Sequence, residues 1–250
     1  MRRRLRAWQQ KWPDPPVLPQ HARLDTTVVI PCYNHARFLP FAVQSLIEQT
    51  LERFDTVLID DCSSDATSGL LPRLAESLQH RGRVTVASHD TNRGQAATLN
   101  EAIASSTTSL VTVLNDDDWL TPTTLETMIA TLQRFPDVVM VGSHSQWFTG
   151  DGRPPAQSVV EAAPVRRFRP SDLRSLRRPN DLNMTHSGMT VARSAWEVVG
   201  GYRPDMSSRV VPYSDRDFQL RVAALYEVAV IDDPLVWWRS DSSVDAGLNS

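Results

Sequence analysis

The sequence predicts an α/β protein built on a mostly parallel, doubly wound sheet. Two observations predict this class: short runs of β-branched residues alternate with longer segments of helical periodicity, and the links between them are short. A chain of 250 residues suits one such domain, and 41% hydrophobic and 22% charged residues are typical of globular proteins with a sizeable core.

The alternation is clearest in the first half of the chain. Residues 26–31 (TTVVIP) are a β-branched run, which predicts a buried strand. Residues 38–50 form a predicted helix because one of its faces gathers Leu39, Ala42, Val43, Leu46 and Ile47. The same reasoning predicts strands at 56–60, 83–88, 109–114 and 138–142 and helices at 65–80, 95–105 and 123–135.

The second half is less regular. Residues 150–155 are a turn-rich link, and residues 165–178 are rich in arginine. We expect a helix at 190–200 around Trp196, followed by a helix at 215–226 and a strand at 227–231.

Residues 1–25 are predicted to form an extended basic arm, with a short helix near residues 4–11. The arm holds four prolines and six basic against two acidic side chains. It is either a solvated tail or a peripheral contact with a membrane surface or a protein. The chain has two cysteines, no secretory signal and no apolar run near the roughly 20 residues of a membrane span, so we expect a cytoplasmic protein, with a membrane-peripheral location as the alternative.

Acidic residues occur where predicted strands end, which is the edge at which open α/β sheets bind ligands. Asp60 and Asp61 end one strand, and residues 115–118 (NDDD) follow another. Converging carboxylates repel one another unless a hard cation such as Mg²⁺ or Mn²⁺ neutralises them. The alternative is a solvated acidic turn that starts the next helix.

The loop after the first strand offers two groups suited to a nucleotide. Tyr33 has a ring on which a base can stack, and Asn34 has a bidentate amide. An ordinary strand-to-helix turn is the alternative.

Four motifs in order resemble the GT-A fold inverting glycosyltransferase family 2. They are VVIPCYNH (28–35), LIDDCSSDAT (58–67), NRGQAATLNEAI (92–103) and LNDDDWLTP (114–122). The resemblance covers about residues 26–245. It implies a single domain at 26–250, with a nucleotide-sugar-binding half at 26–142 and a smaller, irregular acceptor-side half at 143–250.

The resemblance also implies roles for the donor-binding residues. Asp61 would bind the pyrimidine base in a pocket lined by Pro31 and Tyr33, and Arg93 and Asn100 would lie near the base, ribose or diphosphate. Asp117 matches the metal-binding aspartate of the D-x-D loop. Asn115 replaces the usual first aspartate, Asp116 would contact ribose or metal, and Asp118 is a further candidate ligand.

The general base of the family comes from a late carboxylate at a helix start. The matching segment is 214–221 (SDRDFQLR), in which Asp215 would be the base, Ser214 replaces a glutamate and Asp217 is the rival on a different helical face. The family often ends in Y-R-x-H; here Asp241 stands in place of the histidine as a candidate metal ligand.

Several side chains keep open interpretations. His186 is either an acceptor- or donor-facing residue or a buried core histidine. Six arginines form either a grip on an anionic acceptor or diphosphate or a solvated face: Arg166, Arg167, Arg169, Arg174, Arg177 and Arg178. At most one tryptophan is expected to form a sugar-stacking platform, and the candidates are Trp147, Trp196, Trp237 and Trp238.

We therefore expect a Mn²⁺- or Mg²⁺-dependent inverting transferase that uses a nucleotide-diphosphate sugar, with UDP as the expected nucleotide. A glycan, a lipid-linked glycan, a protein or a small molecule would be the acceptor. One alternative is a non-catalytic or partner-dependent sugar-nucleotide binder. Phosphoryl-transfer and receiver domains are disfavoured because Lys11 is the sole lysine, and a net charge of −3 implies no nucleic-acid partner.

Overall fold

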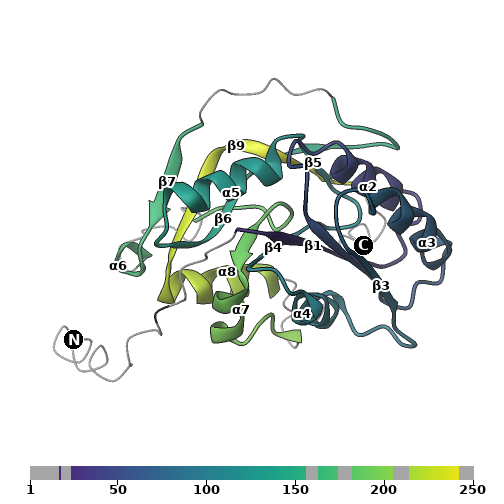
Figure 1. Cartoon of the computed structure of the whole chain (residues 1–250), viewed down its shortest axis with the longest axis horizontal. Coiled ribbons are helices and arrows are strands. Elements are labelled where there is room, and N and C mark those ends of the chain that lie inside the picture. Colours follow the sequence, from purple (N-terminus) through teal and green to yellow (C-terminus); the bar gives the residue numbers. More distant parts are fainter. Residues whose placement is uncertain (1–16, 18–23, 156–162, 174–181, 205–213, 242–250) are drawn as a thin grey trace.

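The computed structural model describes residues 17, 24–155, 163–173, 182–204 and 214–241 (Figure 1). Within these ranges, nine strands form one sheet in the order β3-β2-β1-β4-β8-β6-β9-β5, and β7 also pairs with β9. Parallel pairing accounts for most of the paired residues, so the predicted mostly parallel α/β class is confirmed.

The strands and helices follow the predicted alternation. The strands are β1 (Thr26–Cys32), β2 (Asp55–Asp60), β3 (Val84–Ser88), β4 (Leu110–Val113), β5 (Trp119–Leu120), β6 (Val138–Phe148), β7 (Val165–Phe168), β8 (Thr190–Ala192) and β9 (Glu227–Arg239). The helices are α2 (Leu39–Ile47), α3 (Thr67–Leu78), α4 (Gln95–Ser105), α5 (Thr124–Arg134), α6 (Pro170–Leu173), α7 (Arg193–Val199) and α8 (Ser214–Leu225).

Helices cover both faces of the sheet. In Figure 1, α2, α3 and α5 lie on one side, and α4, α7 and α8 lie on the other. Successive residues of β1 alternate between these faces: Val28 and Ile30 pack in the cluster with α2 and α3, whereas Val29 packs in the cluster with α4. This alternation explains why β1 reads as a continuous apolar run, since both of its faces are buried.

The structure differs from the prediction at several strands. Residues 190–192 form β8, which pairs with β4 and β6, so the helix expected from residue 190 begins at Arg193 instead. The strands β6 and β9 continue well beyond their predicted ends because they pair with each other as far as Phe148 and Arg239. The two-residue strand β5 was not predicted, since it is too short to carry a periodic pattern.

Helix α7 ends at two glycines. Gly200 and Gly201 both have positive φ angles, of 77° and 69°. This left-handed conformation favours glycine and stops the helix.

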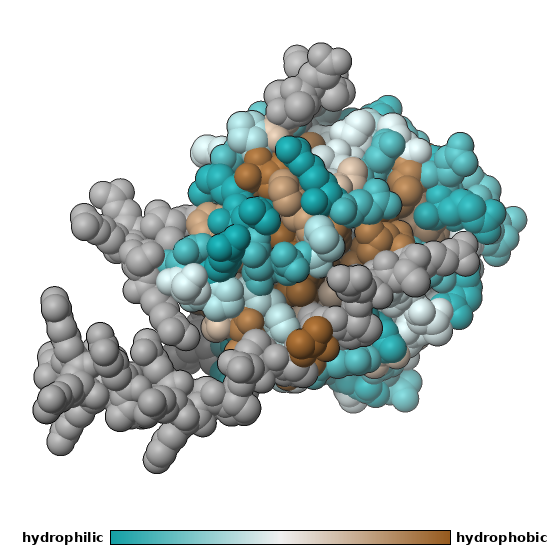
Figure 2. Space-filling view, turned by 60° about the vertical axis from the view of Figure 1, so that its left-hand side comes forward, coloured by the Kyte–Doolittle hydropathy of each residue, from teal (hydrophilic) through white to brown (hydrophobic). Residues whose placement is uncertain are grey.

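The basic arm of residues 1–25 lies almost wholly outside the described residues, as do Arg174, Arg177 and Arg178. None of the helices in the described ranges is long and apolar enough to cross a membrane. The face drawn in Figure 2 is mostly hydrophilic, with hydrophobic residues showing through in several patches.

Candidate functional site

A cavity of about 680 Å³ opens where β1, β2 and β4 end. These neighbouring strands run parallel, so the loops that follow them meet at one edge. Helix α8 and the segment 183–186 close the other side of the cavity. The structure brings six of the predicted site residues to its lining: Pro31, Tyr33, Asp61, Asp116, Asp117 and Asp215.

Asp61 is buried and held in one orientation. Its carboxylate accepts hydrogen bonds from the backbone N–H groups of Arg93 (2.8 Å) and Gly94 (2.7 Å). It also lies 2.7 Å from Nδ1 of His89, whose other ring nitrogen is 3.1 Å from Glu101. These contacts tie the loop after β2 to the start of α4.

Asp116 joins the acidic loop to the first loop. Its carboxylate accepts a hydrogen bond from the backbone N–H of Tyr33 (2.9 Å) and lies 2.7 Å from Nδ1 of His35. Both side chains of this His–Asp pair are buried. No role was predicted for His35, although it directly follows the Tyr33–Asn34 pair.

The best group for a divalent cation consists of His35, Asp116 and Asp117. One ligand atom from each of these residues lies within 4.8 Å of the others. Two carboxylates and an imidazole are a donor set that first-row divalent cations accept. The residues present therefore fit a cation of the predicted kind.

The carboxylate of Asp118, in contrast, accepts hydrogen bonds from other parts of the protein. Asp118 is 1% exposed, and its carboxylate accepts hydrogen bonds from Ser187 (2.5 Å), from Asn115 (3.2 Å) and from the backbone N–H of Arg239 (3.1 Å). Burial, and then the charge of Asp117, raise the pKa of this carboxyl well above its ordinary value. Asp118 does not line the cavity, so we interpret it as a support for the acidic loop rather than as a cation ligand.

Arg239 is the largest fully buried side chain of the described residues. Its Nε donates to the carbonyl oxygen of Asp117 (3.1 Å), and its terminal nitrogens donate to the carbonyls of Gly150 and Gly152. The guanidinium lies 4.3 Å from the ring centres of both Phe38 and Phe148. Arg239 is the arginine of the segment that matches Y-R-x-H, but no role was predicted for it, because the sequence carries no signal that this arginine is buried.

Asp215 and Asp217 lie in different surroundings, although both belong to the first turn of α8. Asp217 is paired with Arg221 (2.8 Å) and Arg203 (3.4 Å). Asp215 lines the cavity, and no hydrogen bond to its carboxylate is found within the described part of the chain. Of the two carboxylates, Asp215 is therefore the one available to a ligand.

His186 lies beside Asp215 in the cavity wall. Its Nε2 is 3.0 Å from the hydroxyl of Tyr202, whose ring stacks on Phe218 at 4.3 Å. Burial lowers the pKa of His186, and the charge of Asp215 opposes that shift. Burial, together with the same charge, raises the pKa of Tyr202. His186 is thus both buried and cavity-lining, so it combines the two interpretations left open by the sequence.

Asn100 is the predicted donor-site residue whose position differs most from expectation. Its amide accepts from the backbone N–H of Tyr202 (2.8 Å) and from Trp196 (3.3 Å), and donates to the carbonyl of Tyr202 (2.8 Å). Asn100 is not part of the cavity lining. Its amide instead fastens α4 to the segment that follows α7.

Three further predicted residues lie outside the cavity lining. Asn34, with a φ of 54°, accepts a hydrogen bond from the backbone N–H of Ser64 (2.7 Å). Arg93 directs its guanidinium to Glu101 (2.9 Å), and the exposed Asp241 accepts from the N–H of Gly150 (2.8 Å). These three side chains therefore support loops around the site in this structure.

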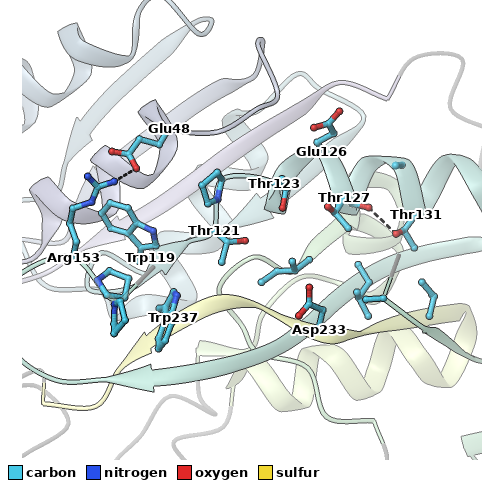
Figure 3. Close-up of a pocket in the computed structure, with 18 of the residues that line it drawn as sticks. Glu48, Trp119, Thr121, Thr123, Glu126, Thr127, Thr131, Arg153, Asp233 and Trp237 are labelled. Carbon is cyan, nitrogen blue, oxygen red and sulfur yellow. Dashed lines mark hydrogen bonds and ion pairs between the residues drawn. The ribbon is translucent and has the colours of Figure 1, made fainter. Parts of the chain in front are cut away.

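A second cavity, of about 820 Å³, contains none of the residues predicted to bind the donor or the cation or to act as the base. It lies between α5 and β9, with Thr127 and Thr131 on one side and Asp233 on the other (Figure 3). Trp237 lines this cavity, whereas its neighbour Trp238 lines the first one. The two cavities therefore lie on opposite faces of β9, and the smaller one holds the candidate chemistry.

The chain matches the family model described as glycosyl transferase family 2 over residues 27–198. It is 32% identical over 105 residues to the succinoglycan biosynthesis protein ExoO of Rhizobium meliloti, which covers 42% of this chain and 29% of that protein. It is 27% identical over 180 residues to the uncharacterized glycosyltransferase YibD of Escherichia coli, which covers 72% of this chain and 48% of that protein. The chain thus spans less than half the length of these relatives.

Two solved structures share the fold. The 1–349 fragment of S. aureus TarS, in complex with UDP-GlcNAc, matches with a TM-score of 0.67 at 16% identity, covering 88% of this chain and 59% of that one. The mannosyltransferase PcManGT from Pyrobaculum calidifontis, in complex with GDP-Man and Mn²⁺, matches with a TM-score of 0.63 at 22% identity, covering 95% and 62%. Both are GT-A glycosyltransferases, so the predicted GT-A architecture is confirmed.

Proposed function

Because the chain belongs to glycosyl transferase family 2, we propose that it transfers a sugar from a nucleotide-diphosphate donor to an acceptor hydroxyl with inversion. One observation carries the proposal: a single cavity joins the acidic loops after β2 and β4 to the available carboxylate of Asp215. The relatives in complex with UDP-GlcNAc and GDP-Man support a nucleotide-sugar donor, and a UDP-sugar is the first to test.

The donor would lie across the ends of β1, β2 and β4. Tyr33 is 37% exposed and offers its ring to the base, with Pro31 beside it. Asp61 would accept from the base, and Asp116 would bind the ribose or support the cation. In this proposal Asn34, Arg93 and Asn100 hold the loops in place, because they do not line the cavity and their side chains bind other parts of the protein.

Asp117 would hold Mn²⁺ or Mg²⁺ together with Asp116 and His35. When bound, such a cation offsets the charge of the diphosphate. Tyr33 and His35 flank the carboxylate of Asp116, so the cation site and the base pocket share one wall.

Asp215 would remove the proton from the acceptor hydroxyl as that oxygen attacks the anomeric carbon of the donor. The bond from that carbon to the diphosphate breaks in the same step, and the nucleoside diphosphate leaves with the bonding electron pair. Attack on the face opposite the leaving group inverts the anomeric centre. Asp217 would not compete as the base, since its carboxylate is neutralised by Arg203 and Arg221.

The two halves of residues 26–250 would act as one domain. The first half, 26–142, supplies the acidic loops, and residues 143–250 supply His144, His186, Asp215 and Trp238 to the same cavity. This shared lining supports the proposal that residues 26–250 form a single domain.

Calorimetric titration with UDP, GDP and dTDP, with and without Mn²⁺, tests the donor site. We expect one nucleotide to bind in a cation-dependent way, and Asp117→Ala to abolish that dependence. The exposed Asp137→Ala is the matched control, because it removes one carboxylate far from the cavity lining. Absence of binding by all three nucleotides in every cation condition contradicts the proposal.

A further inference from the structure

Two exposed tryptophans lie side by side at the edge of the candidate site. Trp147 of β6 and Trp238 of β9 are register partners on parallel strands, so their side chains project from the same face of the sheet. Trp147 is 75% exposed and Trp238 is 39% exposed. Neighbouring strands are about 4.8 Å apart, so the two side chains leave the sheet from neighbouring positions.

This pair extends the cavity. Trp238 lines the cavity itself, and so does Ser145, which precedes Trp147 by two residues and therefore shares its face. The tryptophan pair thus continues a wall of the cavity that Asp215 also lines. An acceptor that reaches Asp215 from this side would pass over the two rings.

The cavity wall that Ser145 belongs to is polar. His144, Ser145 and Asn183 line the adjoining wall. The nearby charge of Asp232 is balanced by Arg166, whose Nε lies 2.7 Å from the carboxylate, while His144 is 3.2 Å from the same group. Aromatic faces beside a few neutral polar groups suit a ligand that has both apolar C–H faces and hydroxyls.

The exposed aliphatic side chains of the helices and strands that the structure describes do not gather around this edge. Val86 belongs to β3, Val198 to α7, and Leu220 and Leu225 to α8, and none of the four lines the cavity. A surface for lipid chains would be expected to present aliphatic side chains next to the indoles. The neutral polar wall instead favours a saccharide.

We propose that the acceptor is a neutral saccharide chain, two units of which stack on Trp147 and Trp238 while a hydroxyl of the terminal unit faces Asp215. This inference rests on the proposed function and specifies the class of its acceptor. Stacking on flat aromatic faces tolerates different sugars, and the polar side chains beside the rings would select among them.

The test uses the full chain, fluorescently labelled at its N-terminus, on an array of neutral and acidic oligosaccharides. We expect binding to a subset of the neutral glycans. Trp147→Ala and Trp238→Ala should each weaken that binding at least tenfold, whereas Trp147→Phe should retain part of it. Val86→Ala is the control for the loss of exposed apolar surface. Thermal unfolding of each variant checks the fold, and Trp147 is so exposed that its truncation removes little packing.

Binding only to acidic glycans, or no glycan binding, overturns the inference. It is also overturned if the chain instead partitions onto vesicles of phosphatidylglycerol and phosphatidylethanolamine in a Trp147-dependent way. Titration of the wild-type chain with UDP and GDP shows whether the acceptor class or the proposed function is at fault. Nucleotide binding without glycan binding overturns only the acceptor class, whereas absence of nucleotide binding contradicts the proposed function itself.

Discussion

Nε of Arg239 lies 3.1 Å from the carbonyl oxygen of Asp117, so the end of β9 fixes the backbone of the residue assigned to the cation. The same guanidinium holds the turn after β6 through the carbonyls of Gly150 and Gly152. Burial lowers the pKa of Arg239, while the neighbouring carboxylates of Asp241, Asp117 and Asp118 oppose that shift. One buried side chain thereby connects two loops that are distant in sequence.

Replacing Arg239 should weaken both folding and cation binding. Arg239→Ala leaves three carbonyls without their donor, and we expect a loss of about 3 kcal/mol in the free energy of unfolding. Arg239→Lys keeps the charge but reaches fewer acceptors, so it should fold better and still bind Mn²⁺-dependent nucleotide more weakly than wild type. Denaturant unfolding and calorimetry measure the two effects, with the exposed Arg73→Ala as the control. Wild-type nucleotide affinity in Arg239→Lys contradicts the positioning role.

Asp215→Asn should remove catalysis and preserve nucleotide binding. Loss of a general base costs about 10²–10⁴-fold in turnover. Asp217→Asn is the matched variant on the same helical turn; it should lose stability, because Arg221 and Arg203 lose their partner, and keep much more of the turnover. Release of nucleoside diphosphate in the presence of an acceptor from the array measures both variants. If Asp217→Asn is the more impaired catalyst at a temperature where both are folded, the assignment of the base is wrong.

Adjacent glycines provide a controlled test of the packing around Asn100. Gly200 and Gly201 share a left-handed backbone, but a Cβ on Gly201 would lie 2.6 Å from Oδ1 of Asn100, whereas one on Gly200 would meet nothing within 4 Å. Gly200→Ala should cost the backbone penalty of about 1–2 kcal/mol, and Gly201→Ala should cost clearly more. Denaturant unfolding measures the two losses. Equal losses of unfolding free energy in the two variants would mean that the side chain of Asn100 moves aside at little cost.

The buried His186 predicts a pH dependence of stability. Its folded pKa is lowered from 6.5, so below that pH the unfolded chain binds a proton that the folded chain resists. This contribution is fully present above pH 6.5 and is lost as the pH falls towards the folded pKa. The free energy of unfolding should therefore decrease more steeply on acidification in wild type than in His186→Gln. If the free energy of unfolding falls equally steeply with pH in the two proteins between pH 7 and pH 5, His186 is not the cause of the pH dependence.

Local patterns predicted the first half of the fold and long-range pairing decided the rest. The elements around the four motifs are contiguous in sequence, so periodicity and motif order located β1, β2, β4 and their loops. Strand β8 has three residues and exists because β4 and β6 pair with it on either side, which no local pattern records. The side chain of Asn100 was misplaced for the same reason, since Tyr202 lies 102 positions away.

Trp237 and Trp238 point to opposite faces of β9, so the register of this strand decides which of the two cavities each ring lines. A slip of one residue would exchange the linings of the two cavities. It would move the ring of Trp238 to the face that α5 covers and withdraw it from the cavity that Asp215 lines. The irregular pairing of β6 with β9 around His144 fixes the alignment just before this point. Loop grafts meant to alter the substrate range should therefore leave the spacing between His144 and Trp147 intact, because a single inserted residue there would reverse which face of the protein presents the aromatic surface.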